Sequence, residues 1–161
     1  MRWRERQRSR GTFFALLIVT GCVSSMINRT SRSLRVDFSA PAEVRLGDSA
    51  MLRLSLHNET GRDIPLSLNG DGGWAFDPLV RRPDGAVIWE RLAHVVMAGR
   101  ASHPVMHPGD SLAFEARWPL VDNSGHRVSA GTYTVIPMLM DAYGEPIIGE
   151  RHGRQIRVLE P

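Results

Sequence analysis

The feature that most constrains the fold of this chain is an alternation of hydrophobic and polar residues between residues 107 and 139. Every second residue from Leu112 to Trp118 is hydrophobic, and in the second run Tyr133, Val135, Pro137 and Leu139 lie on one side. A period of two places one set of side chains on a core and the other toward solvent, so both runs are predicted to be half-buried β-strands. The segment between them, Val121 to Ser129, is rich in turn residues. We therefore expect an antiparallel pair of strands whose uncovered hydrophobic face packs against a second sheet.

Similar signals recur along the rest of the chain. The alternation is clearest between Ala50 and Asn58, where three leucines share one side. A first strand over 34–46 is interrupted at Pro41, which is typical of an edge strand that switches between sheets. Pro83-Asp84-Gly85 lies between two apolar runs and predicts a tight turn. The other expected strands cover residues 64–68, 74–80, 86–89 and 156–159, whereas 91–107 is expected to be a long excursion with at most one short strand.

These signals predict seven to nine short strands and no helix. Turn residues recur roughly every 8 to 12 positions, which is the pattern of an all-β, antiparallel immunoglobulin-like β-sandwich. A chain of 161 residues has room for one such domain, which we place at residues 34–161. The run Gly131-Thr132-Tyr133 predicts a tyrosine corner, in which a tyrosine near the start of a strand bonds to the backbone at a sheet crossover.

The first 21 residues have the three parts of a secretory signal peptide. Five arginines within the first ten residues precede an apolar run from Gly11 to Val19, and two small residues follow. The apolar run is about half as long as the roughly 20 residues that a membrane-spanning helix requires. We therefore predict an exported protein whose signal peptide, residues 1–21, is removed.

The residues around the one cysteine of the chain resemble the bacterial lipobox. Val19, Thr20 and Gly21 precede Cys22 as an aliphatic residue and two small residues precede the lipidated cysteine of that family. The resemblance implies lipidation of Cys22, cleavage before it, and membrane attachment through the acyl chains, with residues 22–33 as a flexible tether. Because residue 23 is not Asp, it further implies the periplasmic face of the outer membrane if the cell has two membranes. The alternative is an ordinary signal peptide with an incidental cysteine.

The charge distribution argues against a nucleic-acid partner. The formal charge of the whole chain is +3, but from Cys22 onward 15 arginines stand against 16 acidic residues, a net charge of −1. No basic patch remains to meet phosphate groups.

No pattern in the sequence predicts catalysis, a cofactor or a metal. A Gly-x-Ser-x-Gly nucleophile elbow and a phosphate-binding glycine loop are both missing. His103 and His107 are four residues apart, but Pro104 argues against a helix that would bring them onto one face. We expect these histidines and His94 to be surface loop residues, we assign turn roles to Asp71, Asp77 and Asp84, and we expect the protein not to be an enzyme.

The tryptophans after the tether fall into two groups. Trp89 and Trp118 lie in alternating strands and are predicted to be core residues. Trp74 follows the flexible run Asn69 to Gly73, which leaves two interpretations open. It is either a further core residue, which we favour, or an aromatic side chain at the tip of a binding loop.

An ordered set of short motifs between residues 50 and 139 resembles the BsuPI-type intracellular proteinase inhibitor domain. The set comprises Leu52-x-Leu54-x-Leu56-x-Asn58-x-Thr60, Ile64-Pro65-Leu66, Phe76-Asp77-x-x-Val80, Asp84-Gly85-x-Val87-x-Trp89, Pro108-Gly109-Asp110-Ser111, Trp118, Gly125 and Gly131-Thr132-Tyr133-Thr134-Val135. The resemblance implies an immunoglobulin-like fold and a protein-binding or protease-inhibiting role. The chain departs from the family at residues 91–101, which lack its aromatic, polar character, and at Pro78, which replaces an aromatic residue.

Together these observations predict a lipid-anchored envelope protein that binds a protein partner, either a protease that it inhibits or regulates or another envelope protein. The alternatives are a structural or adhesive envelope lipoprotein without inhibitory activity and, less favoured, a carrier of a metal or small ligand. The oligomeric state is left open. The predicted partner-binding residues lie in and beside the irregular loop: Trp74, Arg91, Leu92, His94, Val96, Met97 and Arg100.

Overall fold

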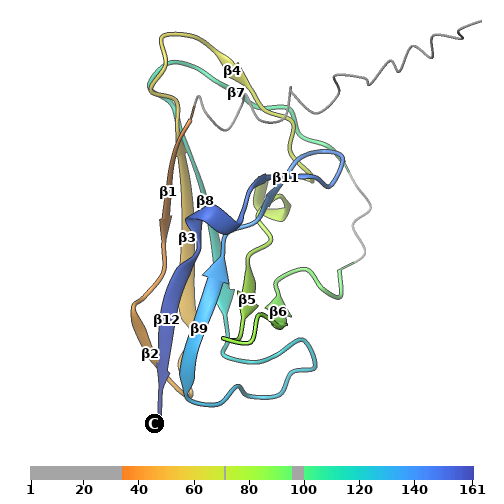
Figure 1. Ribbon diagram of the computed structural model, residues 1–161. Coiled ribbons are helices and arrows are strands. Elements are labelled where there is room, and N and C mark those ends of the chain that lie inside the picture. Colours follow the sequence, from red (N-terminus) through yellow and green to blue (C-terminus); the bar gives the residue numbers. More distant parts are fainter. Residues whose placement is uncertain (1–33, 71, 96–99) are drawn as a thin grey trace, which may run out of the picture.

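The computed structural model describes residues 34–70, 72–95 and 100–161, and the predicted signal peptide, lipobox and tether therefore lie outside the described residues. Two main sheets face each other and enclose one core, with the C-terminus at one end of the sandwich (Figure 1). The all-β, immunoglobulin-like sandwich predicted from the sequence is confirmed. The strands are β1 (Arg35–Ser39), β2 (Glu43–Arg45), β3 (Ala50–His57), β4 (Ile64–Pro65), β5 (Leu79–Arg81), β6 (Val87–Glu90), β7 (Val105–Met106), β8 (Ser111–Trp118), β9 (Gly131–Ile136), β10 (Leu139–Met140), β11 (Pro146–Ile148) and β12 (Arg154–Leu159).

The smaller main sheet has the order β1-β3-β8, and both of its strand pairs are antiparallel. Its central strand β3 shows the predicted alternation, because Leu52, Leu54 and Leu56 are all fully buried. The polar residues between them lie on the outer face, where Arg53 bonds to Glu115 of β8 at 2.7 Å. This sheet thus buries one face and exposes the other, as a period of two requires.

The larger main sheet has the order β2-β12-β9-β5-β6. The predicted break at Pro41 is confirmed, since β1 before it pairs with β3 and β2 after it pairs with β12 of the opposite sheet. The β2–β12 pair is parallel, so the sandwich is not antiparallel throughout. The hairpin of β5 and β6 is also confirmed, with Gly85 in the turn at a φ of 86°.

The expectation that the two strands within 107–139 pair with each other is wrong. β8 pairs with β3, whereas β9 pairs with β12 and β5 in the other sheet. Periodicity shows that each strand has a buried face, but it does not show which strand lies beside it. The segment between them is a crossover, and Tyr133 at its end donates a hydrogen bond to the carbonyl of Ser129 at 2.8 Å. The predicted tyrosine corner is therefore confirmed.

The core is centred on an aromatic cluster that links both sheets. Trp118 of β8 is fully buried, with its ring centroid 6.5 Å from that of Trp89 and 5.5 Å from that of Tyr133. Its indole N–H donates to the carbonyl of Val121 at 3.0 Å, so burial leaves no polar atom of this side chain unpaired. The prediction that Trp89 and Trp118 are core residues is confirmed.

The irregular parts of the chain differ most from expectation. The strand expected over 74–80 covers only Leu79–Arg81, and the residues before it form a short 3₁₀ helix, η1 (Gly72–Trp74). A second 3₁₀ helix, η2 (Glu150–His152), precedes β12. Two small sheets, β4–β7 and β10–β11, complete the structure. Neither helix in the described part of the chain is long and apolar enough to cross a bilayer.

Candidate binding surface

Trp74 is an exposed residue at the end of η1. Its exposed fraction is 45%, whereas Trp118 in the core has an exposed fraction of 0%. Our preferred interpretation of Trp74 as a core residue is therefore wrong, and the alternative of a loop-tip aromatic describes its position. The reason is that η1 is a 3₁₀ helix and not part of a strand, so the expected alternation does not extend to Trp74, although its neighbours Ala75 and Phe76 are both fully buried.

Arg91 holds the Trp74 ring in place. The guanidinium carbon lies 5.8 Å from the centroid of the indole ring, within the range of a cation–π contact. The same guanidinium donates hydrogen bonds to the backbone carbonyls of Gly73 and Phe76, which flank Trp74 on either side. The side chain of Arg91 thus binds the backbone around Trp74 and supports it through hydrogen bonds. We call Trp74, Arg91, Leu92 and His94 the Trp74 platform.

Asp77 binds the backbone of Leu92, the next residue of the platform. Its carboxylate accepts a hydrogen bond from the backbone N–H of Leu92 at 2.9 Å. Burial raises the pKa of Asp77, while the bond from Leu92 and the charge of Arg91 lower it. Burial likewise lowers the pKa of the Arg91 guanidinium, and the charge of Asp77 opposes that effect. Asp77 and Arg91 are both partly buried, and each charge offsets part of the cost of burying the other. Together with the bond to Leu92, this interaction fixes the start of the irregular loop.

His94 is tied to a different part of the chain. Its Nε2 lies 2.7 Å from the carbonyl oxygen of Asn123, and the Asn123 side chain accepts a bond from the backbone N–H of Glu90 at 2.8 Å. The crossover loop between β8 and β9 thereby supports the platform from one side. Arg100 is exposed beyond the gap in the described residues, and the predicted residues Val96 and Met97 lie within that gap.

The structure thus brings four of the predicted partner-binding residues into one region. The platform offers a large exposed aromatic face, a cation and an imidazole on a hydrogen-bonded support. Exposed aromatic and arginine side chains of this kind are the usual anchors of protein–protein interfaces.

A second constellation, not found from the sequence, lies on the outer face of the β1-β3-β8 sheet. Ser111 Oγ is 2.7 Å from His57 Nδ1, and His57 Nε2 is 3.2 Å from Asp37 Oδ2. These are the residue types of a hydrolytic triad, but Asp37 also pairs with Arg35 at 3.2 Å, and Ser111 and Asp37 face solvent. Acyl transfer also needs hydrogen-bond donors, in a site that excludes water, for the oxyanion that develops on the substrate, and these three side chains lie on the open face of a sheet. We therefore interpret the row as cross-strand hydrogen bonding, which only the register of three strands reveals.

His103 and His107 are the other two histidines considered in the sequence analysis. His103 is exposed, and His107 pairs with Asp63 through its Nδ1 at 2.9 Å. Hydrogen bonding to Asp63 raises the pKa of His107. In the ranges that the structure describes, no three His, Cys, Asp or Glu side chains are grouped as metal ligands would be.

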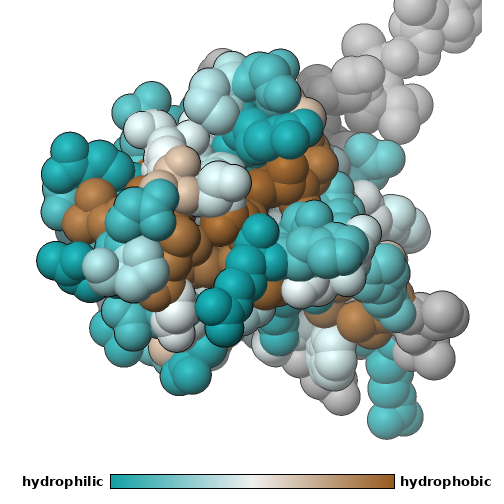
Figure 2. All heavy atoms as spheres, turned by 90° about the horizontal axis from the view of Figure 1, so that it is seen from below, coloured by the Kyte–Doolittle hydropathy of each residue, from teal (hydrophilic) through white to brown (hydrophobic). Residues whose placement is uncertain are grey.

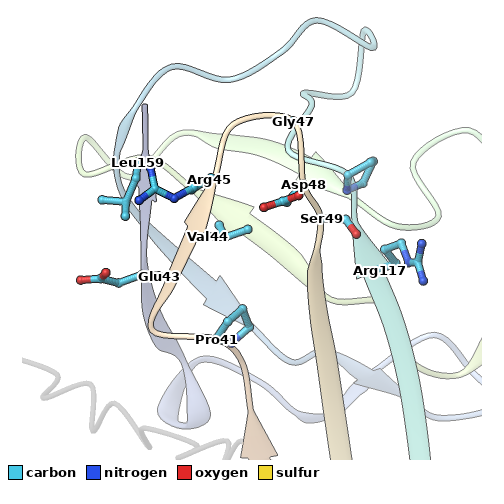
Figure 3. Close-up of a pocket in the computed structure, with 10 residues that line it drawn as sticks. Pro41, Glu43, Val44, Arg45, Gly47, Asp48, Ser49, Arg117 and Leu159 are labelled. Carbon is cyan, nitrogen blue, oxygen red and sulfur yellow. The ribbon is translucent and has the colours of Figure 1, made fainter. Parts of the chain in front are cut away.

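An open groove of about 940 Å³ lies at the C-terminal end of the sandwich. Figure 2 views this end and shows hydrophobic side chains in a hollow between hydrophilic lobes. In Figure 3 the charged side chains of the groove diverge, with Arg117 pointing away from Arg45, so they do not converge on one ligand. The groove is lined by Pro41, Glu43, Val44, Arg45, Gly47, Asp48, Ser49, Arg117, Pro119 and Leu159.

Comparison with known proteins identifies no family for the chain. No protein-family model and no curated protein sequence matches it. Among solved structures, a β-glucosidase from Listeria innocua in complex with glucose aligns at 9% identity and a TM-score of 0.43, over 78% of this chain and 16% of that one. The DNA glycosylase AlkC of Pseudomonas fluorescens aligns at 11% and 0.45, over 79% and 30%. The CARDB domain of the PF1109 protein of Pyrococcus furiosus, solved with two metal ions, aligns at 12% and 0.43, over 78% and 87%.

Proposed function

We propose that this chain is a lipid-anchored protein of the bacterial cell envelope whose sandwich binds another protein through the Trp74 platform and does not act as an enzyme. The observation that carries the proposal is the exposed Trp74 ring, held by an arginine that also binds the backbone on both sides of it. An exposed tryptophan on a hydrogen-bonded support loses little conformational freedom on binding, which lowers the entropic cost of forming an interface around it.

The lipid anchor is supported by the sequence from Val19 to Cys22, which lies outside the described residues. Its test is metabolic labelling with a radioactive fatty acid, followed by detergent partitioning. The wild-type chain should take up label and partition with detergent, and Cys22→Ala should do neither. A labelled Cys22→Ala variant would contradict the anchor.

The partner class that the BsuPI-type resemblance suggests is a protease. A stoichiometric inhibition assay of the purified full chain against a panel of serine proteases tests this role. We expect inhibition by the wild-type chain and at least a tenfold weaker effect for Trp74→Ala, because an aromatic anchor contributes about 2 kcal/mol or more to an interface. Val105→Ala is the matched control, since Val105 is an exposed hydrophobic residue on β7, away from the platform.

The absence of inhibition across the panel would remove the inhibitory role and favour the structural or adhesive alternative. A pull-down from membranes with the wild-type chain, Trp74→Ala and Val105→Ala then decides whether the platform binds any envelope protein. Equal capture by all three proteins would contradict binding through Trp74.

A further inference from the structure

Strand β8 is the last strand of its sheet. One of its edges pairs with β3 over all eight residues without a register shift, and on the other side no strand lies beside it within the part of the chain that the structure describes. A long, regular, unpaired edge offers a row of free N–H and C=O groups to another strand.

The other edge strands are short or interrupted. β1 has five residues and ends just before Pro41, and β2 has three. β6 has four residues, and its pairing with β5 includes a register shift. Short length, proline and bulges are the features that protect sheet edges from pairing. β8 is longer than these strands and pairs without a bulge, although Pro119 follows it directly and η1 lies close to it.

The register identifies which groups face the open edge. His57 and Ser111 are the last pair of the β3–β8 ladder. In the next position, the backbone N–H of Asn58 donates a hydrogen bond to the carbonyl of Asp110 at 2.9 Å. Hydrogen-bonded and non-hydrogen-bonded pairs alternate along an antiparallel ladder, so odd-numbered residues of β8 direct their backbone groups away from β3. This assignment makes Arg53 and Glu115 a non-hydrogen-bonded pair, whose side chains lie close together. Their contact at 2.7 Å agrees with it.

The two charged residues of β8 are both odd-numbered and carry opposite charges. Glu115 bonds to Arg53, whereas Arg117 has no ion-pair partner among the described residues. When two such strands run antiparallel with a two-fold axis at Ala116, Glu115 of each copy faces Arg117 of the other. Opposite charges that face each other across a strand pair stabilise it, and a two-fold axis forms each contact twice.

We propose that the open edge of β8 pairs with β8 of a second copy of this chain, in the antiparallel register centred on Ala116, in which the two strands overlap from Phe114 to Trp118. The two three-stranded sheets become one six-stranded sheet, and on its outer face Glu115 lies between Arg53 of its own chain and Arg117 of the second copy. The paired residues include none of the Trp74 platform, although Trp74 belongs to η1, which lies close to β8. The pairing does not depend on the function proposed above.

The test is the molecular mass of the full chain in a nonionic detergent, measured by size-exclusion chromatography with light scattering that separates protein mass from detergent mass. The wild-type chain should be a dimer. Arg117→Glu should weaken the dimer about tenfold or more, because two opposite-charge pairs become two like-charge pairs. The triple exchange of Arg53→Glu, Glu115→Arg and Arg117→Glu should restore the dimer, since it reverses the charges between the copies and also keeps the pair between residues 53 and 115 within each chain.

Two controls keep the result specific. Arg45→Glu changes a groove arginine on β2 and should leave the dimer intact, and circular dichroism should show that each variant keeps its β-structure. A monomeric wild-type chain, a dimer that Arg117→Glu does not weaken, or a triple variant that stays monomeric would each overturn the proposal.

Discussion

Trp118 and Trp74 are the same residue type in opposite settings. Trp118 lies in a regular strand, fully buried between the two sheets and in contact with Trp89 and Tyr133. Trp74 lies at the end of a 3₁₀ helix with nearly half of its surface exposed, and its main partner is the guanidinium of Arg91. The first holds the sheets together and the second is available to a partner. Phe76 lies outside the named strands and is nevertheless fully buried. The position of a side chain relative to the two sheets, and not its residue type, therefore separates the core from the candidate binding surface.

Truncation of Trp118 tests the core side of this comparison and should have the largest effect. Trp118→Ala leaves a cavity beside Trp89 and Tyr133, and we expect the free energy of unfolding to fall by about 4 kcal/mol. Urea denaturation followed by circular dichroism measures it. A loss below about 1 kcal/mol would mean that the aromatic cluster does not hold the sheets together.

Removal of the Tyr133 hydroxyl separates packing from hydrogen bonding within the same cluster. Tyr133→Phe keeps the ring against Trp118 but loses the bond to the Ser129 carbonyl. The expected loss of unfolding free energy is about 1 kcal/mol, the net value of one hydrogen bond. If the loss of unfolding free energy equals that of Trp118→Ala, the Tyr133–Ser129 hydrogen bond stabilises the fold as much as the packing of the aromatic cluster does.

Truncation of Trp74 tests the surface side. Because the indole is nearly half exposed and is in cation–π contact with Arg91, Trp74→Ala should lower the free energy of unfolding by only about 1 kcal/mol. Its expected effect is on partner binding, as measured in the inhibition or capture assay. A destabilisation as large as that of Trp118→Ala would place Trp74 with the core after all.

The His107–Asp63 contact belongs to neither region and should have the smallest effect, visible only in the pH dependence of stability. The bond to Asp63 raises the pKa of His107 above its usual value, so the folded state holds this proton more tightly than the unfolded state. The resulting stability is fully present below a pH of about 6.5 and is lost as the pH rises through the folded pKa. The urea midpoint should therefore fall with rising pH over this window, and fall less for Asp63→Asn. Equal slopes for the two proteins would contradict the assignment.

Much of the candidate surface was predictable, but its geometry was not. Arg91, Leu92 and His94 were predicted because residues 91–107 show no period and depart from the family pattern. The structure places Arg91 against Trp74, with Leu92 and His94 following it in the chain. The sequence contains no signal for the Arg91 bonds to Gly73 and Phe76, since these join residues 15 and 18 positions apart through backbone carbonyls. The row of Ser111, His57 and Asp37 was missed for a similar reason, because its members lie on three different strands.

The sequence by itself determined which face of each regular strand is buried, where Pro41 breaks the first strand, and where Gly85 turns the chain. These properties depend on side-chain alternation and backbone preference over a few residues, which are local. Only the tertiary structure decided that β8 and β9 belong to different sheets, that Trp74 is exposed, and that β8 has an open edge. Strand pairing depends on how distant segments share one core, and a period of two is the same whichever neighbour a strand has.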